Sequence, residues 1–150
     1  EHVFKNKIEN TLFAGIYNEE IFRELKNKKN IIVIKDSISK KKISISIDKF
    51  YLKNDNAIVI SNNNTVIFTK YRKPFHYLSD FRELNINLKK YKILIVKSGY
   101  LSPELKKLKA DNFMILTDGF VTQDFKRIKN LFREKPIYPF QKNFRYNIAI

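Results

Sequence analysis

The stretch from Lys92 to Gly119 constrains the fold of this chain most, because its pattern is strand, helix and strand. After Lys92, the run ILIV is apolar throughout, which is typical of a strand covered on both faces. SPELKKLKA begins with Ser102 as a helix N-cap and Pro103 at the first helical position. NFMILT is a second apolar run. We therefore predict a βαβ unit at about 92–117, whose two strands are parallel.

A strand-rich section precedes this unit. Ile43, Ile45 and Ile47 alternate with polar residues, which indicates a strand with one face in water. NAIVIS and TVIFTK lie on either side of asparagines that suit a tight turn, so they read as a hairpin. We predict a largely antiparallel section at about 31–69. An apolar run, TLFAGIY, and the helical pattern EEIFREL come earlier.

Together these patterns predict an α/β or α+β fold, with a mixed β-sheet and helices packed on it. The length of 150 residues and the 43% hydrophobic content suffice for one core, so we expect a single domain at 1–150. The chain starts at Glu1 and not at Met, which leads us to expect a fragment of a longer protein. Cysteine is absent, so disulfides and thiolate metal ligands are excluded.

No apolar run approaches the roughly 20 residues that a membrane span requires, and no signal-peptide pattern is present. We expect no membrane partner and a cytoplasmic location.

The formal net charge of +15 raises the hypothesis of a basic nucleic-acid-binding module. Only six of the 30 basic residues are arginine, the residue favoured for bidentate recognition of phosphates and bases. The lysine excess accompanies heavy use of Ile and Asn, a joint bias that AT-rich coding sequences produce. Solvated charge without a polyanion partner is therefore the preferred interpretation, and nucleic acid is not an expected partner.

In an open α/β sheet, ligands bind beyond the carboxyl ends of the strands. The residues at the two strand ends of the predicted βαβ unit are Lys97, Ser98, Gly99 and Tyr100, and Thr117, Asp118 and Gly119. Hydroxyl groups, an ammonium group and glycines that allow close backbone approach suit a carboxylate or phosphate. We predict a substrate or anion subsite here. The alternative is that the glycines only form turns while Lys97 extends into water.

Catalytic motifs are missing from the sequence. His2 and His76 are the only histidines and have no metal-site spacing. The chain has no G-x-S-x-G, P-loop or G-x-G-x-x-G motif, and its aspartates are scattered. We predict no catalytic and no metal-binding residue in this chain.

An ordered set of segments is similar to the C-terminal domain of the microcystinase C (MlrC) family of zinc metallopeptidases. The segments are TVIFTKYRKPFHYLSDFRELNINLKKYKILIVKSGYLSPELKKL, NFMILTDGFVTQDFKRI and REKPIYPF. LFAGIYNEEIFREL also looks like the family's lead-in. The resemblance covers roughly residues 11–140.

The resemblance implies that zinc and its Asp and His ligands belong to a larger N-terminal domain of the parent protein. This chain would then be an accessory domain that lines the active-site cleft and is not catalytic alone. Its implied partners are that N-terminal catalytic domain and a peptide-like or small-molecule substrate. Many members have His-Phe-Arg where this chain has Gly99-Tyr100-Leu101, and proline where it has Asp118, so microcystin is not assumed as the substrate. A purely structural interaction domain is the remaining alternative.

Overall fold

The computed structural model describes residues 2–27, 30–35, 41–97 and 102–115. Residue contacts divide the chain into two compact units, Glu1–Asn112 and Phe113–Ile150. The fold and the site described below belong to the first unit. In the part of the chain that is described, no helix is long and apolar enough to cross a membrane.

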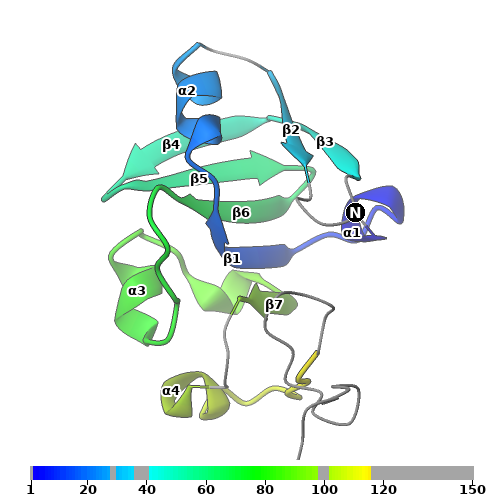
Figure 1. Cartoon of the computed structure of the whole chain (residues 1–150). Helices are drawn as coiled ribbons and strands as arrows, with labels where there is room; N and C mark the ends of the chain where they lie inside the picture. The colour runs from blue at the N-terminus through cyan, green and yellow to red at the C-terminus, as the bar shows by residue number, and fades with distance from the viewer. Residues whose placement is uncertain (1, 28–29, 36–40, 98–101, 116–150) are drawn as a thin grey trace, which may run out of the picture. The chain divides into compact units, whose positions relative to one another are not determined.

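Short helices and seven strands make up the described part of the chain (Figure 1). The helices are α1 (His2–Lys5), α2 (Glu20–Lys26), α3 (Leu78–Arg82), the 3-10 helix η1 (Leu88–Lys90) and α4 (Pro103–Lys106). The strands are β1 (Thr11–Tyr17), β2 (Ile31–Lys35), β3 (Lys42–Ser46), β4 (Lys49–Lys53), β5 (Asn56–Ser61), β6 (Asn64–Thr69) and β7 (Ile93–Val96).

Five of the strands form a mixed sheet in the order β4-β5-β6-β1-β7, and β2 and β3 form a separate antiparallel pair. β4, β5 and β6 pair antiparallel, whereas β1 pairs parallel with both β6 and β7. The mixed α/β sheet and the antiparallel section at 31–69 are therefore confirmed. The parallel pairing of β1 with β6 brings an early strand beside a hairpin some 50 residues later, which no local pattern in the sequence indicates.

Two asparagine-rich turns set the register of the antiparallel strands. Asn54 and Asp55 have φ values of 46° and 56°, and the turn at 62–63 has values of 47° and 59°. Two consecutive residues with positive φ form the primed turn that matches strand twist, and Asn and Asp tolerate this backbone better than most residues. The predicted turn at the asparagine run is confirmed.

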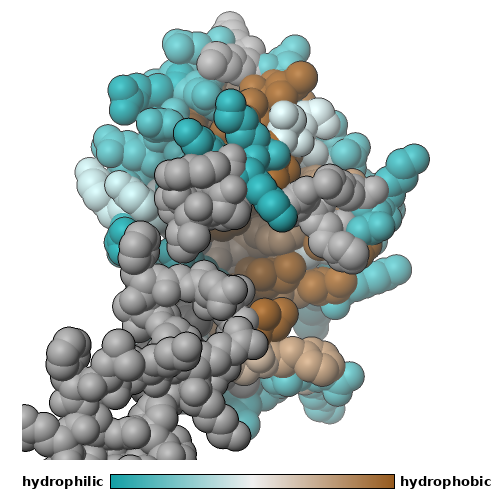
Figure 2. Space-filling view, turned by 45° about the vertical axis from the view of Figure 1, so that its right-hand side comes forward, coloured by the Kyte–Doolittle hydropathy of each residue, from teal (hydrophilic) through white to brown (hydrophobic). Residues whose placement is uncertain are grey.

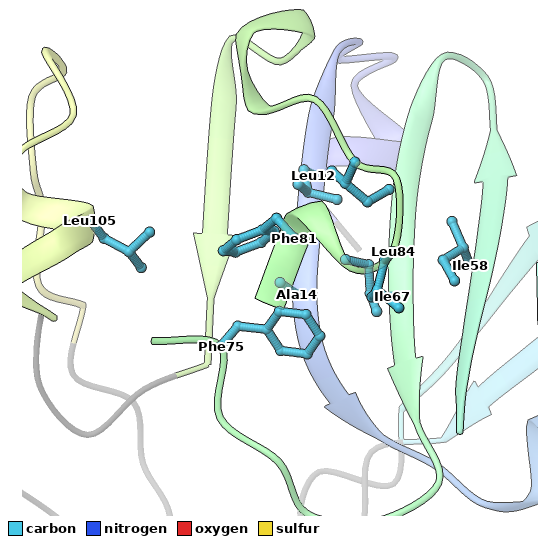
Figure 3. Packing of buried hydrophobic residues seen from close by; sticks show 9 residues of the cluster. Leu12, Ala14, Ile58, Ile67, Phe75, Phe81, Leu84 and Leu105 are labelled. Carbon is cyan, nitrogen blue, oxygen red and sulfur yellow. The ribbon is translucent and has the colours of Figure 1, made fainter. Parts of the chain in front are cut away.

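The sheet is covered on both faces. On one face, Leu12 and Ile67 of the sheet pack with Phe75, Phe81 and Leu84 from the segment around α3 (Figure 3). The rings of Phe75 and Phe81 are 5.3 Å apart between centroids. All six residues of β6 are buried, because β6 lies inside the sheet and both of its faces are covered.

The opposite face is covered by α2 and by the β2–β3 pair. Ile21 and Leu25 of α2, together with Ile32 and Ile45, pack on the side chains of β5 and β6 that point to this side. The alternation of side chains along each strand divides the apolar residues between the two clusters.

The predicted βαβ unit at 92–117 is only partly found. Its first strand, β7, and its helix, α4, are present, and the Ser102 hydroxyl accepts a hydrogen bond from the Leu105 N–H at 3.2 Å as a helix cap. Residues 111–115 form no strand, and 116 and 117 lie outside the described residues. The parallel partner that β7 has is β1.

β7 is also more exposed than its apolar sequence predicts. Ile93 and Ile95 are 40% and 41% exposed, while Leu94 and Val96 pack against the core. The prediction of a strand covered on both faces is wrong here, because β7 is the outermost described strand beside β1 and only one of its faces meets the core.

A buried asparagine fastens the start of β6 to the start of β1. The Asn64 side-chain oxygen accepts a hydrogen bond from the Thr11 N–H at 2.9 Å. Its amide nitrogen donates to the carbonyl oxygens of Ile8, at 2.8 Å, and Asn62, at 3.1 Å. Asn64 is 1% exposed, so water cannot replace these bonds if the side chain is removed.

We expect Asn64→Ala to lower the free energy of unfolding by about 2–3 kcal/mol, because it leaves buried backbone groups without partners. Urea denaturation followed by circular dichroism measures this. Asn112→Ala is the matched control: Asn112 is exposed and, among the described residues, its side chain donates only to the nearby carbonyl of Ala110, so the change should cost less than about 0.5 kcal/mol. Equal losses in the two variants would contradict the role of Asn64.

Candidate functional site

The candidate site lies along one edge of the five-stranded sheet. Because β1, β6 and β7 are parallel, their carboxyl ends, at Tyr17, Thr69 and Val96, lie at the same edge. The β4–β5 turn lies there too, because Asn56 at the start of β5 pairs with Thr69 at the end of β6. We call this side of the sheet the carboxyl edge. It is where α/β sheets most often bind ligands.

Lys97 is the one predicted site residue that the structure describes, and it lies at the carboxyl edge as predicted. Its backbone N–H donates to the Ala14 carbonyl at 3.1 Å, so the pairing of β7 with β1 continues to this residue. The Lys97 side chain is exposed. Its ammonium group is therefore attached to a well-supported backbone and is open to solvent.

The other predicted site residues, Ser98, Gly99, Tyr100, Thr117, Asp118 and Gly119, lie outside the described residues. Whether they join Lys97 at one edge stays a prediction.

Gly15 forms a bulge in β1 beside Lys97. The register against β6 shifts between Ala14 and Ile16, and Gly15 has a φ of +83°, a conformation that side-chain-bearing residues rarely adopt. A Cβ at Gly15 would lie 3.4 Å from the Phe75 ring, 3.5 Å from the Lys73 carbonyl oxygen and 3.9 Å from the Lys97 Cβ. The glycine thus lets the chain after β6 and the Lys97 side chain approach β1 closely.

The segment that follows β6 adds further cations to the carboxyl edge. Arg72 and Lys73 are both exposed. The Arg72 guanidinium lies 5.7 Å from the centroid of the Tyr17 ring, and the Lys73 ammonium lies 5.7 Å from that of Phe75. Contacts of cations with aromatic faces hold the side chains without neutralising them.

Asp80 holds the backbone of this segment in place. Its carboxylate accepts hydrogen bonds from the N–H groups of His76, at 3.1 Å, and Tyr77, at 2.9 Å, and lies 3.2 Å from the Lys73 ammonium. Asp80 is buried, so these bonds are shielded from water. The exposed Lys73 side chain is thereby partly neutralised, whereas neither Lys97 nor Arg72 has a carboxylate partner within the described residues.

α4 supports the same segment from the other side. The Ser102 hydroxyl donates to the His76 carbonyl, and the Leu78 N–H donates to the Glu104 carboxylate at 2.7 Å. Ser102 therefore both caps α4 and binds the segment that precedes α3. The chain between β6 and α3 is therefore held at its α3 end by hydrogen bonds to Asp80, Ser102 and Glu104.

Lys70 stays protonated at neutral pH. Its pKa is raised above the ordinary lysine value, chiefly by the hydrogen bond and charge interaction with the Tyr71 hydroxyl, and further by Asp55 and Glu19. Its ammonium group lies 5.3 Å from the centroid of the Tyr71 ring.

Sequence reasoning missed Gly15, Arg72 and Lys73. An isolated glycine within a strand pattern is a known sign of a bulge and was available for Gly15. No comparable sign exists for Arg72 and Lys73, because their place at the edge depends on the pairing of β6 with β1.

A metal centre does not fit the described residues. Within them, no three side chains of His, Cys, Asp or Glu lie close enough together to hold a metal ion.

A family model described as MlrC C-terminus matches residues 40–130. No curated protein matches the chain. The matched residues begin just before β3, run through α4 and include Lys97 and the segment that carries Arg72 and Lys73. They make up more than half of the 150 residues, and the resemblance inferred from the sequence motifs is confirmed. The chain belongs to the MlrC C-terminus family and is the C-terminal domain of an MlrC-like protein.

Proposed function

We propose that this chain is an accessory domain of an MlrC-like metal-dependent hydrolase. In this proposal it lines the active-site cleft of a catalytic domain in the same protein and has no catalytic activity alone. The observation that carries the proposal is the position of Lys97: an exposed ammonium group on a well-supported strand end, at the edge of the sheet where ligands usually bind.

The chemistry of the carboxyl edge favours a substrate with an anionic group. Lys97 and Arg72 offer positive charge that no described carboxylate neutralises. The Gly15 bulge allows a close backbone approach at Lys97. A peptide-like or small-molecule substrate that carries a carboxylate would be bound and oriented by these groups, while zinc and its ligands would belong to the catalytic domain.

The exposed face of β7 supports a partner domain. Ile93 and Ile95 are well exposed on the strand that ends at Lys97. Figure 2 shows hydrophobic residues gathered toward the middle of one face, with hydrophilic residues above them. Apolar side chains next to a polar site are typical of a surface that another domain covers.

The first test concerns the isolated chain. We expect the purified 150-residue protein to fold, to bind less than a tenth of an equivalent of zinc (about 0.1 per chain, against the near-unit stoichiometry of a structural or catalytic site) and to show no peptide hydrolysis. Metal analysis after dialysis and a peptidase assay measure this. Stoichiometric zinc, together with hydrolysis that a chelator abolishes, would show that the domain is itself catalytic.

The second test concerns Lys97 in the full-length protein. We expect Lys97→Gln to lower kcat/KM by about tenfold or more, mostly through KM, because a charge-assisted hydrogen bond to substrate is lost. Lys92→Gln is the matched control: it removes the same charge at the opposite end of β7 and should leave KM unchanged. If both variants behave like the unmodified protein, the cleft-lining role of Lys97 is wrong and a purely structural role gains support.

A further inference from the structure

A cavity of about 290 Å³ lies at the carboxyl edge, between α2, the β4–β5 turn and Lys70. Figure 1 shows the elements that contribute its lining residues, α2, β4 and β5. This volume is at the lower end of the range of small-molecule sites, so the cavity suits a ligand of only a few non-hydrogen atoms.

The walls of the cavity combine apolar and cationic side chains. Phe22 and Leu52 are its apolar lining residues, and Lys26, Lys53 and Lys70 line the same space. Phe22 and Lys26 are four residues apart on α2, so they lie on one face of the helix. Elements far apart in the sequence thus bring three cations to a single cavity.

Hydrogen bonds fix the turn that forms the cavity's rim. The Asn56 side-chain amide donates to the carbonyl oxygens of Lys53 and Asn54. The Lys70 N–H donates to the Asp55 carbonyl at 3.0 Å, which joins the turn to the end of β6. The backbone positions of Lys53 and Lys70 are therefore fixed before a ligand binds, which reduces the entropy lost on binding.

The cavity carries an excess of positive charge. Asp55 is the one carboxylate that lines it, against three lysines. Among the described residues, neither Lys26 nor Lys53 forms an ion pair. The pKa of Lys70 is raised chiefly by its interaction with the Tyr71 hydroxyl and further by the carboxylates of Asp55 and Glu19, so that lysine is the most nearly neutralised of the three. The remaining two positive charges favour an anionic ligand.

We propose that this cavity binds a small organic anion, a carboxylate or phosphate ester with a short apolar group. The anionic group lies between Lys26, Lys53 and Lys70, and the apolar group packs against Phe22 and Leu52. The lysines act as point charges and favour an anionic ligand, while the apolar walls favour a ligand with a short apolar group.

This site is distinct from the one at Lys97. The cavity involves β4, and Lys97 follows β7 at the other end of the strand order, about 19 Å away at the usual spacing between strands. The proposal does not need a catalytic domain, so its test uses the chain alone and does not depend on the proposed function.

The test is a titration of the ¹⁵N-labelled 150-residue chain with butyrate, butyl phosphate, acetate and the neutral butyramide, followed by amide chemical shifts. We expect saturable shifts confined to the amides of residues 22–26, 53–56 and 70, with a Kd on the order of 1 mM for butyrate or butyl phosphate. Whichever of butyrate and butyl phosphate binds with the lower Kd identifies the preferred anionic group. Acetate should bind about tenfold more weakly, because it lacks two CH₂ groups, and butyramide should produce no saturable shift.

A pair of variants separates this site from the general charge of the chain. Lys26→Gln with Lys53→Gln should weaken butyrate and butyl phosphate binding about tenfold or more, as expected for losing charge-assisted contacts. Lys89→Gln with Lys90→Gln removes two charges from η1 and should leave the affinity unchanged. The amide spectra of both variants show whether the fold is retained.

Three results would overturn the proposal. Shifts spread over lysines across the surface without saturation would show general counterion attraction to a chain of net charge +15. Equal weakening by the two pairs of variants would show the same. Acetate binding as tightly as butyrate would show that Phe22 and Leu52 take no part in binding.

Discussion

The parallel pairing of β1 with β6 is the interaction on which the rest of the described fold depends. Asn64 fastens the beginnings of the two strands through side-chain hydrogen bonds to Thr11 and Ile8, and the side chain is buried. The pairing joins the early strand to the antiparallel hairpins and gives the sheet its mixed character. The other edge of β1 pairs with β7. Without the pairing of β1 with β6, the antiparallel hairpins would remain, but the carboxyl edge would not form.

Two local features, together with that pairing, form the site at the carboxyl edge. The Gly15 bulge lets the chain after β6 pass close to β1, and the buried Asp80 carboxylate holds that chain by its backbone. Arg72, Lys73 and Lys97 then lie along one edge, although they come from different parts of the sequence. Aromatic rings and one ion pair position two of these cations, and the Lys97 ammonium group is left open to a ligand.

The structure shows where the positive charges lie, which the net charge of the composition does not. A net charge of +15 on a lysine-rich sequence is explained well enough by solvated side chains. The fold, however, places cations at two positions on the carboxyl edge. One is Lys97, and the other is the cavity beside α2. Convergence on a cavity with apolar walls distinguishes Lys26, Lys53 and Lys70 from lysines such as Lys89 and Lys90, which lie exposed on η1.

The sequence by itself determined most of the local elements, the antiparallel section at about 31–69, the asparagine turn and the family. These follow from the period of apolar side chains, the backbone preferences of Asn and Pro, and an ordered set of motifs, all of which act over a few residues. It also placed Lys97 correctly at a strand end.

Only the tertiary structure decided which strands are neighbours. The strand predicted around Ile43 and Ile45 is β3, which ends at Ser46, and β4 begins three residues later at Lys49 but joins the other sheet. β7 pairs with β1, and no described residue of 112–117 forms a strand beside it. The physical reason is that strand pairing over long sequence separations depends on which faces bury the most apolar surface together. That balance is a property of the whole core, so neither the carboxyl edge nor the cavity at its end can be read from any one segment.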